Sequence, residues 1–169
     1  MRAVSVPRAS RANRPIAQPV QGPSHAGDLV NRKRILLADD HKEFLFSIRD
    51  MLSPRYDIVG IVRDGEALIT AARATMPDLI ISDLRMPGMN GLKAAARLLE
   101  ERPTDIIFLT IESSPSYARK ALSVGARGYV LKTYAAEQLP TAILEVLAGR
   151  QFISPQIPFA IPALNVAPA

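Results

Sequence analysis

The chain has 169 residues, enough for one domain with a full hydrophobic core but too few for two. It contains no cysteine and only two histidines, His25 and His41, which excludes disulfides and thiolate chemistry and argues against a histidine-rich metal site. The net charge of +5 comes from residues 1–34, which carry seven basic side chains and one acidic one, whereas residues 35–150 carry 14 basic and 15 acidic side chains. Any bound metal is therefore expected on carboxylates, the ligands that Mg²⁺, Mn²⁺ and Ca²⁺ prefer.

The two ends of the chain differ in composition from its middle. Residues 1–32 are basic, contain four prolines and show no apolar periodicity, which predicts a disordered leader. Such a leader can attract nucleic acid or anionic lipid through charge alone, although a solvated segment is the preferred interpretation. Residues 151–169 carry four prolines and no charged side chain, which predicts an extended tail. The folded domain is therefore expected over residues 33–150.

Five short apolar runs in the middle of the chain predict strands buried on both faces, as in a parallel sheet. These runs are 34–39, 56–62, 78–83, 105–110 and 128–131. Amphipathic patterns typical of helices fill the intervals and follow the last run. The helical patterns cover 44–52, 67–75, 92–99, 117–124 and 139–147. This alternation predicts an α/β fold in which one parallel sheet lies between two layers of helices.

Polar side chains stand where four of the predicted strands end. Asp39 and Asp40 follow the first strand, Asp83 the third, Thr110 the fourth and Lys132 the fifth. Because the carboxyl ends of parallel strands meet at one edge of the sheet, we expect these five side chains to converge. Three carboxylates at one place repel each other unless a cation lies among them, and oxygen-only ligation suits Mg²⁺.

The expected cluster is suited to phosphoryl transfer onto an aspartate. A carboxylate can attack phosphorus, while Mg²⁺ and Lys132 neutralise the phosphoryl oxygens and Thr110 donates a hydrogen bond to them. A single aspartate at a strand end more often caps the following helix. Five polar residues at matching strand ends favour a functional site over that simpler interpretation.

With these residues the sequence resembles the receiver domain of bacterial two-component response regulators, over about residues 33–154. The motifs that carry the resemblance are 37–41 (LADDH), 83–91 (DLRMPGMNG), Thr110 and 125–132 (GARGYVLK). The resemblance implies a three-layer, flavodoxin-like α/β fold with a doubly wound sheet of five parallel strands and five helices. The sequence from 142 to 155 is similar to the branch that usually continues into a helix-turn-helix output domain.

The resemblance also implies a role for each site residue. Asp83 would be the phosphoacceptor, and Lys132 would bind the phosphoryl group. The ligands of Mg²⁺ would be Asp39, Asp40, Asp83 and the backbone carbonyl of Arg85. Thr110 and Tyr129 would be the switch residues. Spacing alone would make Tyr129 a core aromatic residue, but its place three residues before Lys132 favours the switch role. His41 is interpreted as a residue near solvent at the start of a helix, without a catalytic role.

The function that follows from the resemblance is a phosphorylation-dependent signalling switch rather than a metabolic enzyme. It would accept a phosphoryl group from a histidine kinase or phosphotransfer protein in the cytoplasm and signal through a protein–protein or dimer surface. Only 20 residues follow Gly149, and residues 35–169 contain no basic recognition helix, so no sequence-specific DNA binding is expected of the chain. No apolar run is long enough to span a membrane.

Three positions bear on how such a site would work. Ile111 stands where the family usually has a small residue, and its bulk is expected to narrow the phosphorylation pocket. Arg85 and Glu112 each lie two residues beyond a site residue and carry opposite charges. We hypothesise that this pair flanks the phosphoryl group, hinders the attacking water and slows autodephosphorylation.

Three alternatives remain open at this stage. The first is a pseudo-receiver that binds a protein without being phosphorylated, for which Ile111 is the one favourable feature. A magnesium-dependent phosphohydrolase usually has a second acid two residues after the nucleophile, and Arg85 occupies that position here. A dinucleotide-binding enzyme is disfavoured because no G-x-G-x-x-G pattern follows the first strand.

Overall fold

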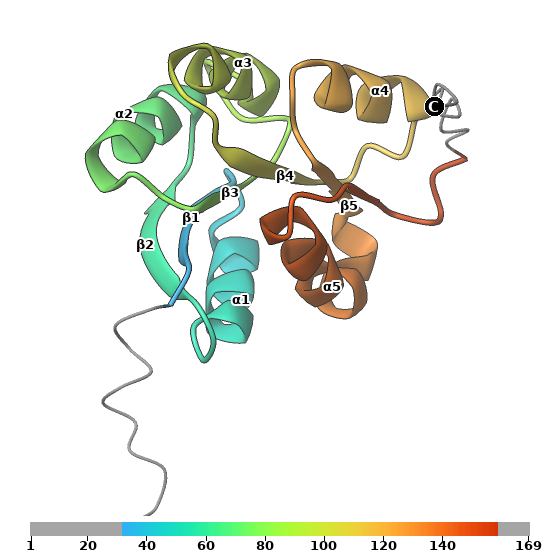
Figure 1. The fold of residues 1–169 in the computed structure, drawn as a ribbon, viewed down its shortest axis with the longest axis horizontal. Coiled ribbons are helices and arrows are strands. Elements are labelled where there is room, and N and C mark those ends of the chain that lie inside the picture. The colour runs from blue at the N-terminus through green and yellow to red at the C-terminus, as the bar shows by residue number, and fades with distance from the viewer. Residues whose placement is uncertain (1–31, 159–169) are drawn as a thin grey trace, which may run out of the picture. The chain divides into compact units, whose positions relative to one another are not determined.

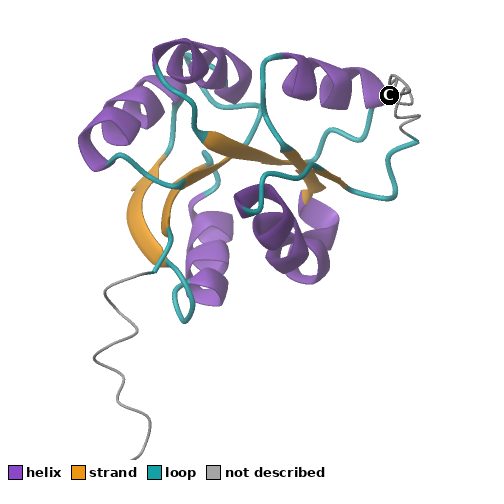
Figure 2. Ribbon diagram, in the orientation of Figure 1, coloured by secondary structure: helices purple, strands orange, loops and turns teal. Residues whose placement is uncertain are grey.

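Strands and helices alternate through residues 32–158, the part of the chain that the computed structural model describes (Figures 1 and 2). The predicted leader and the last eleven residues lie outside this part, apart from Arg32. The elements in chain order are β1 (Arg34–Ala38), α1 (Lys42–Leu52), β2 (Asp57–Val62), α2 (Gly65–Thr75), β3 (Leu79–Ser82), α3 (Gly91–Glu101), β4 (Asp105–Thr110), α4 (Pro115–Ser123), β5 (Gly128–Leu131), a short 3₁₀ turn (Lys132–Tyr134), α5 (Ala135–Leu147) and β6 (Phe152–Ile153).

The sheet is parallel throughout, with the strand order β2-β1-β3-β4-β5-β6. The predicted doubly wound α/β fold with five helices is therefore confirmed, but the prediction of five strands is wrong because the sheet has six. β6 comprises two residues that pair with Gly128 and Tyr129 of β5. A strand of two residues has no periodicity to detect, and β6 lies in the stretch predicted to be a tail.

Helices cover both faces of the sheet. α2, α3 and α4 lie over one face, and α1 and α5 lie over the other (Figure 1). Successive strand residues therefore point into two different cores: Leu36 and Phe108 belong to one, and Leu37 and Ile107 to the other. Both faces are buried, which explains why the strands are continuous apolar runs instead of alternating ones.

The strand order places a crevice at the carboxyl ends of β1 and β3. The chain leaves β1 towards β2 on one side, and β3 lies on the other side of β1, so the connections diverge at this point. Ligand sites of doubly wound sheets lie at such a switch point. Backbone hydrogen bonds extend the strand pairing to the first residues of both loops, from the Asp39 N–H to the Val62 carbonyl (3.1 Å) and from the Asp83 N–H to the Ala38 carbonyl (2.8 Å).

Polar caps begin three of the helices. The side chain of Asp64 accepts a hydrogen bond from the Ala67 N–H at the start of α2, and Asn90 accepts one from Lys93 at the start of α3. α4 begins with Ser114 as the cap and Pro115 at the first helical position. These caps fix where each loop at the carboxyl edge of the sheet ends.

The chain after α5 is held against β5 by a buried polar network. Ser154 is fully buried, and its hydroxyl accepts a hydrogen bond from the Leu131 N–H (2.9 Å) and donates one to Oε1 of Gln138 (2.6 Å). Gln138 in turn donates to Oε1 of Gln156 (2.8 Å), and Ile157 is buried in the core on the α4 side. Residues 152–157 therefore belong to the folded unit. Within residues 32–158, no helix has the length and apolar character needed to cross a membrane.

Candidate functional site

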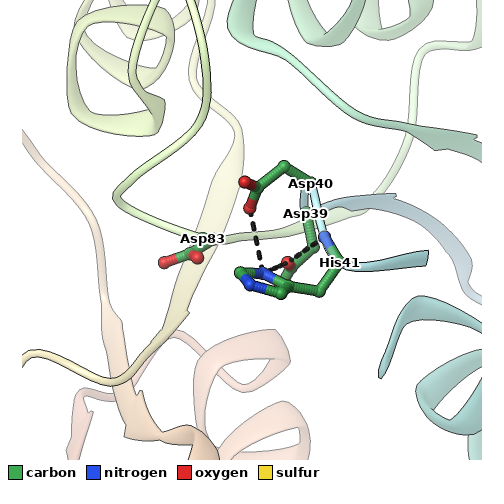
Figure 3. A group of neighbouring side chains, drawn as sticks. All are labelled: Asp39, Asp40, His41 and Asp83. Carbon is green, nitrogen blue, oxygen red and sulfur yellow. Dashed lines mark hydrogen bonds and ion pairs between the residues drawn. The ribbon is translucent and has the colours of Figure 1, made fainter. Parts of the chain in front are cut away.

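Four side chains with possible metal-ligand atoms gather at the carboxyl edge of the sheet (Figure 3). Asp39 and Asp83 are buried where β1 and β3 end, and Asp40 and His41 follow on the loop before α1. One ligand atom from each of the four lies within 4.8 Å of all the others. The structure thus brings together the three carboxylates that the sequence placed at two strand ends.

Lys132 bridges two of these carboxylates. Its Nζ lies 2.6 Å from Oδ2 of Asp39 and 2.8 Å from Oδ2 of Asp83, and its side chain is only 10% exposed. Burial disfavours the ammonium, but the hydrogen bonds with Asp39 and Asp83 outweigh burial and raise the pKa of Lys132 above its ordinary value. The centre of the Phe44 ring lies 5.0 Å from Nζ, and the ring covers the ammonium from α1. Lys132 is therefore a fixed positive charge beside Asp83.

The carboxylate oxygens that Lys132 does not contact fit a divalent cation. Among the described residues, Oδ1 of Asp83 accepts only a long hydrogen bond, from the Arg85 N–H (3.3 Å), and Oδ1 of Asp39 accepts one from the His41 N–H (2.9 Å). Oδ1 of Asp40 is buried and accepts no hydrogen bond from any residue of the described part. A buried acceptor without a donor is costly, and a cation would remove that cost. The oxygen donors are of the kind that Mg²⁺ prefers.

The loop that carries Asp83 is held tightly against the start of α3. The Gly91 N–H donates to the Leu84 carbonyl (3.0 Å) and closes the loop. A Cβ at Gly91 would overlap the backbone carbonyl of Asp83, so only glycine allows this approach. The backbone of Arg85, whose carbonyl is the remaining predicted metal ligand, lies within this closed loop.

Thr110 and Tyr129 are both linked to Glu112. The Glu112 N–H donates a hydrogen bond to Oγ1 of Thr110 (3.3 Å), and the hydroxyl of Tyr129 donates one to the Glu112 carbonyl (2.9 Å). Both side chains are fully buried. Burial, together with the charges of Glu112 and Asp83, raises the pKa of Tyr129, so its hydroxyl stays protonated. Tyr129 points inward in this structure.

The predicted pair of opposite charges, Arg85 and Glu112, is formed. Nε of Arg85 lies 2.6 Å from Oε1 of Glu112. The guanidinium of Arg85 also donates to the hydroxyl of Tyr117 on α4 (3.1 Å) and lies against its ring. Glu112 therefore contacts Arg85 through its side chain and the two switch candidates through its backbone, a convergence that the sequence does not reveal.

A pocket of about 350 Å³ opens above Asp83. Its lining residues are Asp40, His41, Phe44, Asp83, Arg85, Ile111 and Lys132. Ile111 is 71% exposed and forms part of the wall. A larger hollow of about 440 Å³ lies at the opposite edge of the sheet, but none of the predicted site residues lines it. The smaller pocket is therefore the candidate functional site.

His41 is the residue of this site that the sequence interpretation left without a role. It does stand at the start of α1, as predicted, and its side chain is 68% exposed. Its Nδ1, however, lies 3.1 Å from Oδ1 of Asp39 and 3.1 Å from Oδ1 of Asp40 (Figure 3). The only available signal was its position directly after two acidic residues at a strand end.

The fold and the site together define a class of protein, the α/β signalling domains that carry a buried aspartate and a lysine at the carboxyl edge of a parallel sheet. The chain belongs to the response regulator receiver domain family, whose family model matches residues 35–144. Membership places the protein in two-component signalling and makes phosphorylation-dependent signalling its general function.

Similar proteins come from several bacteria. Response regulator GacA of Pseudomonas aeruginosa is 33% identical over 127 residues, which is 73% of this chain and 59% of GacA. The crystal structure of a LuxR-family two-component response regulator from Aurantimonas sp. SI85-9A1 has a TM-score of 0.72 and 32% identity, and the match covers 75% of this chain and 93% of that one. A Salmonella typhimurium RcsB structure, described in terms of DNA interaction, has a TM-score of 0.70 and 30% identity. The match covers 75% of this chain and 65% of that one.

The prediction that excluded sequence-specific DNA binding from the partners is wrong. RcsB is known in complex with DNA, and other relatives are transcriptional regulatory proteins. The prediction rested on the lack of a basic recognition helix in residues 35–169. That observation concerns only the stretch that corresponds to the receiver part, and the chain spans less than two thirds of the length of the curated relatives it matches.

Proposed function

We propose that Asp83 accepts a phosphoryl group from a histidine kinase and that the resulting charge is read by Thr110 and Tyr129. The observation that carries the proposal is the bridge formed by Lys132, which lies within hydrogen-bond distance of both Asp39 and Asp83 in a nearly buried position. An ammonium held there can pass from a carboxylate oxygen to a phosphoryl oxygen without entering the pocket from outside.

Each step of the transfer uses a group already at the site. An oxygen of Asp83 forms a bond to phosphorus as the bond from phosphorus to the nitrogen of the donor histidine breaks, and the electron pair stays on that nitrogen. Lys132 neutralises part of the charge on the phosphoryl oxygens. When bound by Asp39, Asp40, Asp83 and the carbonyl of Arg85, Mg²⁺ supplies further neutralisation.

The hydrogen bonds of Glu112 suggest how the signal leaves the site. If the Thr110 side chain moves so that its hydroxyl donates to a phosphoryl oxygen, Oγ1 leaves the Glu112 N–H, which then loses its acceptor. The same residue holds Tyr129 through its carbonyl, so a shift of its backbone changes the position of the tyrosine. Tyr129 lies on β5, between α4 and α5, which makes this side of the domain the surface for a protein partner or a second copy.

Several earlier predictions stay predictions. These are the cytoplasmic location, self-catalysed transfer and dephosphorylation, and the division into a leader (1–32), a receiver domain (33–150) and a tail (151–169), although residues 152–157 of that tail pack on β5. The pseudo-receiver is kept as a second candidate because the exposed side chain of Ile111 forms part of the pocket wall.

The test is to incubate the protein with Mg²⁺ and a small phosphodonor such as acetyl phosphate and to measure its intact mass. The switch predicts one phosphoryl adduct per chain in the wild type and none in Asp83→Asn. An unmodified wild type would support the pseudo-receiver. Repeated consumption of the donor without a detectable adduct would indicate a phosphohydrolase.

A further inference from the structure

His41 contributes a nitrogen atom to a pocket that is otherwise lined by oxygen ligands. Its ring is one of the four side chains in Figure 3, beside Asp39, Asp40 and Asp83. We propose that Nδ1 of His41 is a direct ligand of the divalent cation, so that the site prefers a first-row transition ion such as Mn²⁺ to Mg²⁺. This inference rests on the proposed function, because it concerns the same cation.

The distances around Nδ1 are those of neighbouring ligands on one ion. Ligand atoms about 2.1 Å from an octahedral cation lie about 3.0 Å apart at adjacent positions. Nδ1 lies 3.1 Å from Oδ1 of Asp39 and 3.1 Å from Oδ1 of Asp40. A single cation can therefore contact all three atoms with little movement of the side chains.

A hydrogen bond accounts for only one of the two contacts that Nδ1 of His41 makes with Asp39 and Asp40. The ring nitrogen meets hydrogen-bond geometry with Asp39 alone, and Oδ1 of Asp40 accepts no hydrogen bond in the described part of the chain. A nitrogen that carries one proton cannot satisfy two acceptors at once. A cation among the three atoms would satisfy both carboxylates and the nitrogen lone pair together.

Lys132 does not compete for the same atoms. It contacts the Oδ2 atoms of Asp39 and Asp83, whereas His41 lies beside Oδ1 of Asp39 and Oδ1 of Asp40. The pocket thus has one set of oxygens for the ammonium and another for the cation, and His41 belongs to the second set.

Helix capping does not explain the position of the ring. His41 is the N-cap residue of α1, but its side chain makes no capping hydrogen bond to the helix. The ring is mostly exposed, so core packing does not fix it either. What the ring does contact is the pair of carboxylates. Its removal should leave the fold intact, which makes the proposal testable by substitution.

The nitrogen ligand predicts a metal preference. Mg²⁺ binds oxygen and water almost exclusively, whereas first-row transition ions also accept imidazole nitrogen. The imidazole should therefore strengthen the binding of Mn²⁺ and contribute little to that of Mg²⁺. Without His41, the site would keep only its oxygen ligands and its affinity for Mg²⁺.

The experiment uses Mn²⁺ and Mg²⁺ with the full chain, in the wild type and in the variants His41→Ala, His25→Ala and Asp40→Asn. Pulsed electron paramagnetic resonance of bound Mn²⁺ should show coupling to an imidazole nitrogen in the wild type and in His25→Ala, but not in His41→Ala. The affinity for Mn²⁺ should fall at least about tenfold in His41→Ala, while that for Mg²⁺ changes by less than about twofold. His25 is the matched control, since it is the only other histidine of the chain.

The possible negative results distinguish failure of the His41 ligand from failure of the whole cation site. If wild-type protein binds Mn²⁺, if Asp40→Asn abolishes binding, and if no imidazole coupling appears, the acidic site stands and the role of His41 is refuted. An equal loss of affinity for both ions in His41→Ala also refutes it. If the wild type binds neither ion, the cation site of the proposed function fails, and this inference fails with it.

Discussion

The hydroxyl of Tyr129 donates a hydrogen bond to the backbone carbonyl of Glu112 across 2.9 Å, from the interior of β5 to the loop after β4. The bond ties a fully buried aromatic ring to the loop that also carries the acidic partner of Arg85. It gives the site a direct connection to the side of the domain between α4 and α5.

Replacing Tyr129 by phenylalanine should separate phosphorylation from its readout. Tyr129→Phe keeps the ring but leaves the carbonyl of Glu112 without this donor, so the free energy of unfolding should fall by about 1 kcal/mol. The adduct on Asp83 should still form. Phosphorylation should speed hydrogen exchange at the Glu112 amide in the wild type, because Thr110 turns away from it. A wild type whose exchange at Glu112 is unchanged by phosphorylation would contradict the proposed readout.

Removing Lys132 should destabilise the protein when no divalent cation is present. Lys132→Ala leaves Asp39 and Asp83 buried without their shared ammonium, which is expected to cost about 3 kcal/mol in urea unfolding. Addition of Mg²⁺ should reduce the difference from the wild type, since a cation replaces part of the missing charge. The control is Lys93→Ala, at an exposed lysine without an ion pair in the described structure. Equal stability of Lys132→Ala and the wild type would argue against the bridge.

The ion pair between Arg85 and Glu112 should prolong the life of the phosphoryl group. Arg85 lines the pocket, and its Nε lies 2.6 Å from Oε1 of Glu112, so the pair is expected to restrict the approach of water to the phosphorus. The double variant Arg85→Ala, Glu112→Ala should lose phosphate several-fold faster than the wild type, measured as the decay of the intact-mass adduct. Arg73→Ala, which breaks an ion pair far from the pocket, serves as the control. Faster loss in the wild type than in the double variant would refute the hypothesis.

The pair formed by Arg73 of α2 and Glu101 of α3 should give a pH-dependent contribution to stability. The hydrogen bond from Arg73 lowers the pKa of Glu101 below its ordinary value. A lowered pKa in the folded state means that the contribution is present above the ordinary pKa of glutamate and is lost as the pH falls through the lowered value. Glu101→Gln should therefore melt below the wild type at pH 7, and the difference should vanish in acid. Glu100→Gln, without an ion pair in the described residues, should show no such difference at either pH.

Ser154 should matter to stability although the sequence places it in a tail. Ser154→Ala leaves both the Leu131 N–H and Oε1 of Gln138 without a partner inside the protein, which is expected to cost about 2 kcal/mol. Ser123→Ala, at an exposed serine at the end of α4, is the matched control. Urea unfolding of the two variants decides the matter: a loss no greater for Ser154→Ala than for Ser123→Ala would show that the network is not stabilising.

The main features of the fold could be predicted because each rests on a local pattern. Strands buried on both faces are continuous apolar runs, and the parallel arrangement then places Asp39, Asp83 and Lys132 at one edge without further information. β6 could not be found in this way. Its two residues form a strand only because β5 presents a free edge for pairing. The existence of that edge depends on the whole sheet and cannot be read from the two residues.

The contacts within the site are harder to predict than the identity of the residues that form it. The orientation of the His41 ring depends on side-chain torsions that spacing does not determine. The role of Glu112 depends on its backbone N–H and carbonyl, which every residue of the chain has, so no residue pattern marks it. The formation of the Arg85–Glu112 pair could be anticipated because both residues carry charge and follow site residues at equal spacing.

The attachment of β6 to β5 ties residues 152–157 to the sheet. Because Ser154 and Ile157 are anchored beside β5, this stretch rests on the strand that bears Tyr129 and not on the end of α5. A displacement of β5 would therefore carry Ser154 with it, through the hydrogen bond that its hydroxyl accepts from the Leu131 N–H.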